Sequence, residues 1–224
     1  VLHYAPIEAT VAGEPEALFP FLGCSRLAET IDRFEAVKAV FHGHAHHGTY
    51  TGTTRRGIPV FNAPFSNTRS VVELVIGEII ALARRLTEKT EKMHAGVWDK
   101  SAKGAHEVRG RTLGIIGYGN IGAQLSVVAE AFGMHVSFYD LEDKLALGNA
   151  ERCDTLDELL ERAETVTLHV DGRGGNAGLF GAEQFAKMRP RSLFLNLSRG
   201  FVVDYDALRG MLDEVGRTVH VHAS

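Results

Sequence analysis

The segment TLGIIGYGNIG, from Thr112 to Gly122, is the strongest indication of the fold of this chain. Its first five residues form a short apolar run that predicts a buried strand, and Gly119 to Phe132 has the apolar spacing of a helix. Between them, Gly117 allows a tight turn, Gly119 lets a pyrophosphate approach the backbone, and Gly122 lets the helix pack closely on the strand. The stretch therefore predicts a dinucleotide-binding turn, the alternative being a turn whose glycines serve packing alone.

An acidic residue follows at the position where a ribose needs one. The next apolar run, His135 to Tyr139, predicts a second strand, and Asp140 follows it, eighteen residues after Gly122. A carboxylate there accepts hydrogen bonds from the ribose hydroxyls of an adenosine, and no arginine follows directly to hold a 2′-phosphate. The sequence therefore predicts NAD rather than NADP as the cofactor.

Short apolar runs and helical stretches alternate through the rest of the second half. Further strands are predicted over residues 166–170, 192–197 and 218–222, and further helices over 156–163, 182–188 and 205–215. Strands that alternate with helices indicate βαβ units with right-handed crossovers. The predicted fold class is α/β, with a Rossmann-type doubly wound parallel sheet.

Two candidate side chains stand at strand ends, where open parallel sheets bind their ligands. Arg199 follows the run that ends at Leu197, and an arginine there can clamp a carboxylate through two hydrogen bonds. Its alternative is an arginine exposed in a loop. His169 ends the preceding predicted strand, where it faces either the cofactor crevice or the core.

The first part of the chain carries a second chemical signal, a cluster of histidines. His42, His44, His46 and His47 lie within six positions after a predicted strand, and His3 ends another. Imidazoles on alternate residues of a loop can point into one site, and zinc, manganese and iron accept them as ligands. The pattern favours a divalent metal site built from His3, His44 and His46, with a solvated histidine-rich loop as the alternative.

The residues between these two signals predict a boundary near Gly57. The polar segment from Thr49 to Gly57 is a candidate linker or hairpin between predicted strands over 37–41 and 58–61. Residues 25–34 have helical spacing, and the longest helical pattern runs from Ser66 to His94 with a broad apolar stripe. We therefore expect an incomplete α/β segment before the Rossmann-type sheet.

Composition narrows the classes of function. The 224 residues, 45% of them hydrophobic and 23% charged, suffice for one or two packed domains. A formal net charge of −4 argues against a nucleic-acid partner, no apolar run is long enough to predict a membrane-spanning helix, and no signal peptide is recognised after Val1. With only Cys24 and Cys153, the sequence argues against a disulfide framework and favours the reducing cytoplasm.

From about Gly57 to Arg209, the chain resembles the D-isomer-specific 2-hydroxyacid dehydrogenases, and most closely their phosphoglycerate dehydrogenase branch. Five segments carry the resemblance: GIPVFNAPFSNTRSVVELVIGE (57–78), RGRTLGIIGYGNIGAQL (109–125), VSFYD (136–140), TLHV (167–170) and LFLNLSRGFVVDYDAL (193–208). It implies an NAD-dependent oxidoreductase. For that branch, the implied reaction is the oxidation of 3-phosphoglycerate to 3-phosphohydroxypyruvate, at the entry to serine biosynthesis.

The resemblance also implies roles for single residues. It places Asn120 and Ile121 on NAD in the glycine loop, Asp140 on the ribose, and Leu197, Ser198 and Arg199 near the nicotinamide. The substrate-binding catalytic arginine of the family falls on Arg199, so the implied substrate is a small 2-hydroxy acid.

Two regions beyond these positions bear on activity. Residues 67–94 resemble the helix through which the family forms dimers, which implies a homodimer. The proton-accepting histidine of the family and its acidic partner have no match after Leu208, where His220 and His222 stand in an unmatched context. A catalytically incomplete NAD-binding module is therefore an alternative to an active dehydrogenase.

Residues 1–62 resemble instead the C-terminal part of the calcineurin-like metallophosphoesterases. VLHYAP (1–6) resembles their strand–His–x–x–Pro segment and FHGHAH (41–46) their Gly-His-x-His segment. This implies His3, His44 and His46 as metal ligands of a metal-dependent phosphoesterase fragment, although the family's earlier ligands have no match. The alternative is that residues 25–62 are a diverged end of the dehydrogenase substrate domain.

The sequence is thus interpreted as three parts. Residues 1–57 form the incomplete α/β fragment, residues 58–108 a linking strand and long helix, and residues 109–224 a C-terminally truncated NAD-binding Rossmann domain.

Overall fold

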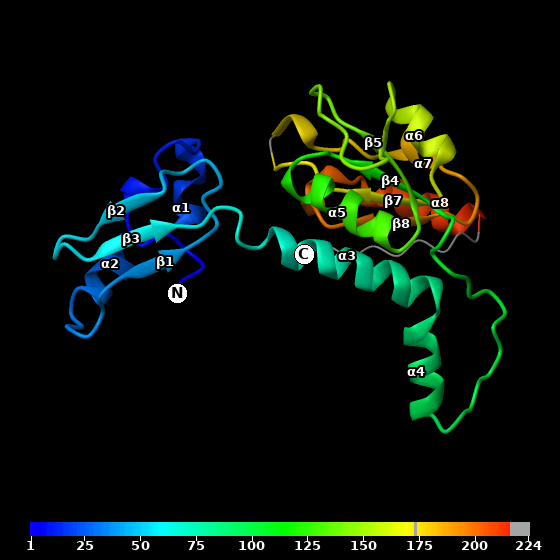
Figure 1. The fold of residues 1–224 in the computed structure, drawn as a ribbon, viewed down its shortest axis with the longest axis horizontal. Coiled ribbons are helices and arrows are strands. Elements are labelled where there is room, and N and C mark those ends of the chain that lie inside the picture. The colour runs from blue at the N-terminus through cyan, green and yellow to red at the C-terminus, as the bar shows by residue number, and fades with distance from the viewer. Residues whose placement is uncertain (173, 216–224) are drawn as a thin grey trace. The chain divides into compact units, whose positions relative to one another are not determined.

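The computed structural model describes residues 1–172 and 174–215 and divides the chain into two compact units, Val1–Asn67 and Thr68–Ser224. The boundary lies ten residues beyond Gly57, because the strand after Gly57 pairs with strands of the first unit. The predicted strand over 218–222, with His220 and His222, lies outside the described residues. Each unit is described by itself below, with the labels of Figure 1.

The first unit is built on a small mixed sheet in the order β1-β3-β2, in which β1 pairs with β3 in parallel and β2 pairs with β3 antiparallel. Its elements are η1 (Glu8–Thr10), η2 (Glu16–Leu18), α1 (Phe19–Leu22), α2 (Ser25–Ile31), β1 (Val40–His42), β2 (Thr51–Thr53) and β3 (Pro59–Asn62). Of the two alternatives for residues 49–57, a linker or a hairpin, the structure has the hairpin, since β2 and β3 are joined by a turn in which Gly57 has φ +84°. Val40, Ile58 and Val60 form a small buried core under the sheet.

The second unit contains a five-stranded sheet in the order β6-β5-β4-β7-β8, with every described strand pair parallel. The strands are β4 (Thr112–Ile116), β5 (His135–Tyr139), β6 (Glu151–Arg152), β7 (Thr165–Leu168) and β8 (Leu193–Asn196). The chain starts in the centre at β4, moves outward to β6, and returns to build β7 and β8 on the other side. This order is the dinucleotide-binding arrangement, and it confirms the predicted fold class.

Helices cover both faces of this sheet (Figure 1). Residues of α3 (Thr68–Ala83) and α5 (Asn120–Ala131) pack with Leu113 and Ile115 on one face. Residues of α6 (Leu156–Arg162), α7 (Ala182–Lys187) and α8 (Tyr205–Val215) pack with Ile116 and Leu168 on the other. The remaining short helices are η3 (Gly174–Asn176) and η4 (Gly200–Val202). The sheet is therefore doubly wound.

The helical pattern from Ser66 to His94 is two helices rather than one. Helix α3 ends at Ala83, and α4 (Leu86–His94) begins after Arg85, which adopts a left-handed conformation with φ +56°. The Arg85 guanidinium donates to the carboxylate of Glu88 in the first turn of α4 and to the carbonyl of Lys103. Figure 1 shows the two helices running in different directions. Within the described ranges, no helix is both long enough and apolar enough to cross a membrane.

Candidate functional site

The glycine loop between β4 and α5 is packed so tightly at two positions that a side chain is excluded. Gly117 has φ +93°, and a Cβ there would lie 2.7 Å from the carbonyl oxygen of His169 on the neighbouring strand end. A Cβ on Gly122 would lie 2.3 Å from the carbonyl oxygen of Gly117. Both glycines therefore allow the turn and the close approach of helix and strand that the sequence predicted.

The third glycine faces open space. A Cβ built on Gly119 meets no atom within 4 Å, and Gly119 is the N-cap of α5 without any side-chain hydrogen bond to the helix. Asn120 and Ile121 begin the helix there, the first exposed and the second half-buried. The first N–H groups of a helix lack intrahelical partners and carry partial positive charge, so this open end fits a pyrophosphate.

Asp140 follows β5 directly and sits beside the glycine loop. The backbone N–H of Tyr118 donates to its Oδ2 at 2.7 Å, and the backbone N–H of Glu142 donates to its Oδ1 at 2.9 Å. A carboxylate has about four acceptor positions, so two hydrogen bonds leave room for the two hydroxyls of a ribose. The structure therefore holds the Asp140 carboxylate, the predicted partner of the ribose, next to the glycine loop.

His169 lies at the end of β7, on the other side of the glycine loop. Its Nε2 lies 3.0 Å from the hydroxyl of Thr167, and its Nδ1 is buried with no hydrogen-bond partner among the described residues. Burial lowers the pKa of His169 to about 4, because the charged form loses its hydration. The imidazole is therefore neutral near neutral pH.

The loop after β8 brings the remaining predicted residues to the same edge of the sheet. Leu197 is buried, and the hydroxyl of Ser198 donates to the carbonyl of Val170 after β7. Arg199 is exposed, and its Cγ would lie 3.4 Å from a Cβ on Gly172. Within the described residues, no carboxylate pairs with its guanidinium. Arg199 is therefore placed to receive an anion at the carboxyl ends of β7 and β8.

One residue of this region was not singled out from the sequence. Tyr118 lies inside the glycine motif, and its ring is buried against Phe138, with ring centroids 3.7 Å apart. Its position between Gly117 and Gly119 could have indicated a special role, because the turn itself does not need a large aromatic residue.

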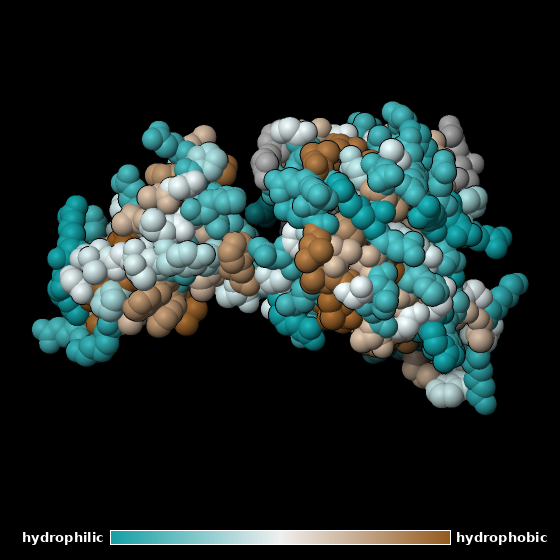
Figure 2. Space-filling view, turned by 45° about the horizontal axis from the view of Figure 1, so that its top comes forward, coloured by the Kyte–Doolittle hydropathy of each residue, from teal (hydrophilic) through white to brown (hydrophobic). Residues whose placement is uncertain are grey.

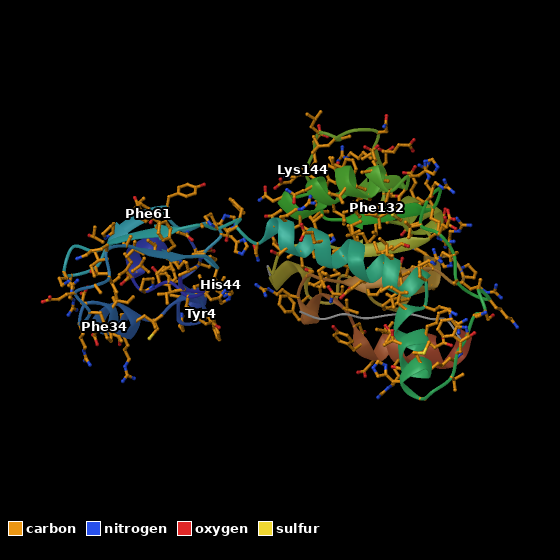
Figure 3. All side chains as sticks on the ribbon, turned by 60° about the horizontal axis from the view of Figure 1, so that its bottom comes forward. Tyr4, Phe34, His44, Phe61, Phe132 and Lys144 are labelled. Atoms are coloured by element: carbon orange, nitrogen blue, oxygen red, sulfur yellow. The ribbon has the colours of Figure 1, made fainter. Side chains whose placement is uncertain are left out.

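Among the residues that the structure describes, His3, His44 and His46 do not form the predicted metal site. The rings of His3 and His44 lie side by side with centroids 4.5 Å apart, and Tyr4 packs against both, as Figure 3 shows for Tyr4 and His44. The ring of His46 lies instead against Phe65. The described residues contain no group of three or more histidine, cysteine, aspartate or glutamate side chains arranged to hold a metal ion.

The backbone explains this difference. Strand β1 ends at His42, whose ring is buried and hydrogen-bonded to Thr10, and His44 then adopts φ +73°. The alternation of an extended chain stops at that turn, so alternate histidines no longer face one way.

The chain matches the model of the D-isomer specific 2-hydroxyacid dehydrogenase NAD binding domain over residues 76–218. It is 53% identical over 159 residues to the D-3-phosphoglycerate dehydrogenase of Haemophilus influenzae. The aligned region covers 71% of this chain and 39% of that protein. It is 54% identical over 155 residues to D-3-phosphoglycerate dehydrogenase 1 of Saccharomyces cerevisiae, covering 69% and 33%. The chain thus spans about two fifths or less of the length of these relatives.

The fold also resembles that of a solved structure, the NAD-dependent formate dehydrogenase of Staphylococcus aureus in complex with NAD. The TM-score is 0.68 at 24% sequence identity, over 88% of this chain and 60% of that one. These findings confirm the dehydrogenase resemblance, and they lend no support to a metallophosphoesterase segment in residues 1–62.

Proposed function

Because the chain belongs to the D-isomer specific 2-hydroxyacid dehydrogenases through their NAD-binding domain, we propose that NAD binds along the carboxyl edge of β4, β5, β7 and β8. The pyrophosphate would lie over Gly119 and the first N–H groups of α5, contacted by Asn120 and Ile121. The adenosine ribose would bind Asp140. The observation that carries this proposal is the open, uncapped helix end at Gly119 beside a carboxylate already held by two backbone N–H groups.

We place the nicotinamide half between the ends of β7 and β8. His169, Leu197 and Ser198 would line it, with the neutral His169 imidazole adding no positive charge. When bound, NAD would supply the hydride acceptor, and the chain's own contribution there is orientation. Arg199 would hold the substrate carboxylate through its forked guanidinium, which leaves the hydroxyl-bearing carbon facing the cofactor.

We propose 3-phosphoglycerate as the substrate and 3-phosphohydroxypyruvate as the product, a step of serine biosynthesis. The support is the identity of 53–54% to proteins named D-3-phosphoglycerate dehydrogenase. The chain covers 39% of the first of these relatives. The proposal therefore assigns cofactor and substrate binding to this chain, and it names no residue that accepts the hydroxyl proton.

We further propose a homodimer formed through α3 and α4. Apolar patches interrupt the mostly hydrophilic surface in Figure 2. Several large apolar side chains on these helices and just after them are exposed, namely Leu74, Leu86, Met93, Val97 and Trp98. Such a set costs free energy in water and is typical of an interface. The free cysteines Cys24 and Cys153 agree with the cytoplasm as the proposed location.

For the domain organisation, we propose that the first α/β fragment includes β3, that α3 and α4 form the linking segment, and that the NAD-binding domain begins at residue 109. The support is that β4, which begins at Thr112, is the first strand of the five-stranded sheet, whereas β3 pairs only with strands of the first unit among the described residues.

The test is direct titration of the purified 224-residue chain with NAD and with NADP by isothermal titration calorimetry. We expect NAD to bind and NADP to bind more weakly, because Asp140 repels a 2′-phosphate. The proposal fails if neither nucleotide binds to protein whose circular dichroism shows a folded α/β chain, or if both bind equally well.

A further inference from the structure

Tyr118 is a buried anchor inside a loop that would otherwise consist of small residues. It stands between Gly117 and Gly119, yet only 3% of its surface is exposed. Its ring stacks on Phe138 of β5, with centroids 3.7 Å apart and planes at 18°. The phosphate loop is therefore attached to the neighbouring strand through a side chain, in addition to its backbone.

The hydroxyl of Tyr118 joins two further segments. It lies 2.7 Å from the Oγ of Ser126 on α5, and the backbone N–H of Leu147 donates to it at 3.1 Å. The single proton of Ser126 goes to the carbonyl of Ala123 at 2.8 Å, so Tyr118 must donate to Ser126 and accept from Leu147. The buried hydroxyl of Tyr118 therefore connects α5 to the loop that follows β5, as a donor to Ser126 and an acceptor from Leu147.

The backbone of the same residue holds the near end of that loop. The N–H of Tyr118 donates to Asp140 at 2.7 Å, and the other oxygen of Asp140 accepts from Glu142. Asp140 begins the loop and Leu147 lies near its end, so Tyr118 contacts the loop at both places. The segment between them carries Leu141 and Leu145, whose side chains are 83% and 85% exposed, and Lys144, labelled in Figure 3.

We propose that Tyr118 is a positioning residue for the adenosine half of the NAD site, an inference that rests on the proposed function. It ties the glycine loop, α5 and residues 141–147 into one unit before the nucleotide arrives. Asp140 then needs no rearrangement to receive the ribose, and the exposed Leu141, which directly follows the Asp140 carboxylate, would offer the adenine an apolar surface. Pre-ordering of a loop raises affinity because less conformational freedom is lost on binding.

A second anchor shows why the hydroxyl is the sensitive point. Beyond Leu147, the N–H of Asn149 donates to Glu130 on α5 at 2.7 Å, so the far end of the connection stays attached without Tyr118. Loss of the Tyr118 hydroxyl would therefore loosen residues 141–147 near Leu147, while Glu142 and Asp143 keep their contacts with Asp140 and Arg152 and the strands and α5 stay in place. The ring, which packs on Phe138, would also remain.

The test compares Tyr118→Phe with the parent chain, using AMP as the probe of the adenosine half and nicotinamide mononucleotide as the probe of the other half. We expect AMP and NAD to bind about tenfold more weakly to the variant, and nicotinamide mononucleotide to bind as before. Amide hydrogen exchange should rise in residues 141–147 and remain unchanged in β4 and β5. Ser126→Ala, which leaves the Leu147 contact, should weaken AMP binding less, and it serves as the second variant if Tyr118→Phe does not fold.

Tyr139→Phe is the matched control, since it removes a hydroxyl next to Asp140 for which the structure describes no hydrogen bond. Its AMP affinity should equal that of the parent. The inference is overturned if Tyr118→Phe binds AMP within twofold of the parent, or if AMP and nicotinamide mononucleotide weaken equally. If the parent chain binds neither NAD nor AMP, the proposed function is wrong and this inference fails with it. If Tyr118→Phe shows faster hydrogen exchange in residues 141–147 but binds AMP as tightly as the parent, only this inference is overturned.

Discussion

Gly117 lies directly against the backbone of His169, so that a Cβ at residue 117 would come within 2.7 Å of the His169 carbonyl oxygen. The two residues directly follow β4 and β7, the adjacent strands at which the order of the sheet reverses. Ligands of open α/β sheets bind at this reversal. The contact therefore holds the glycine loop against the end of β7, beside the proposed cofactor site.

Two alanine substitutions in the glycine loop should separate stability from binding. Gly117→Ala should lower the free energy of unfolding by roughly 1–3 kcal/mol, because it puts a Cβ at φ +93° and against His169. Gly119→Ala should leave the stability nearly unchanged, because a Cβ there meets no atom within 4 Å. It should still weaken NAD binding about tenfold or more, since the methyl group occupies the space proposed for the pyrophosphate. Urea denaturation and calorimetric titration measure the two effects. Equal losses of stability in both variants would contradict this account of the loop.

Asp140→Ala should weaken NAD binding by roughly tenfold or more, because hydrogen bonds from a ribose to a charged group are lost. The affinity for NADP should change less, so the preference for NAD narrows. The matched control is Asp143→Ala, which removes the same charge from the same loop at a side chain that is 93% exposed and paired with Arg152. Parallel titrations with both nucleotides check this prediction, which fails if Asp143→Ala narrows the preference as much.

His169 should make the stability of the chain depend on pH. Its pKa is lowered to about 4 in the folded state from an ordinary value of 6.5, so the unfolded chain binds more protons between these values. The contribution of His169 to the free energy of unfolding is therefore fully present above about pH 6.5. It declines as the pH falls toward 4, by at most about 1.4 kcal/mol per pH unit. Thermal melting at pH 7 and pH 5 should show a smaller drop for His169→Gln than for the parent.

His135→Gln is the control for this measurement, because His135 is exposed at the start of β5. Its drop in melting temperature should match that of the parent. A drop in His169→Gln as large as the parent's would mean that His169 is not the titrating group.

The 224-residue chain alone should oxidise 3-phosphoglycerate negligibly when supplied with NAD. The curated relatives are much longer chains, of which it spans 39% or less in the two cases given above. Loss of the hydroxyl proton needs a base, whose help is typically worth about 10²–10⁴-fold. The assay is NADH absorbance. A robust rate that Arg199→Ala abolishes would contradict the prediction and direct attention to His220 and His222.

Most elements of the second unit could be predicted because their signals are local. The apolar run of β4, the helical spacing of α5 and the strand β5 before Asp140 each depend on a few adjacent residues, and the structure has them within a residue or two of the expected bounds. The glycine spacing predicted the turn for the same reason, since φ +93° at Gly117 is a property of one position. The two-residue strand β6 was missed because it is too short for any periodicity.

The doubly wound NAD-binding fold and the residues at its carboxyl edge could be predicted from the amino-acid sequence, because hydrophobic period and glycine geometry depend on neighbouring positions. Which distant residues meet could be seen only in the folded chain. There, α3 ends before Arg85, the chain turns at His44 so that three histidines do not converge, and Leu147 lies at the hydroxyl of Tyr118, twenty-nine residues away along the chain. Such contacts depend on packing among several elements, and no local pattern of residues specifies them.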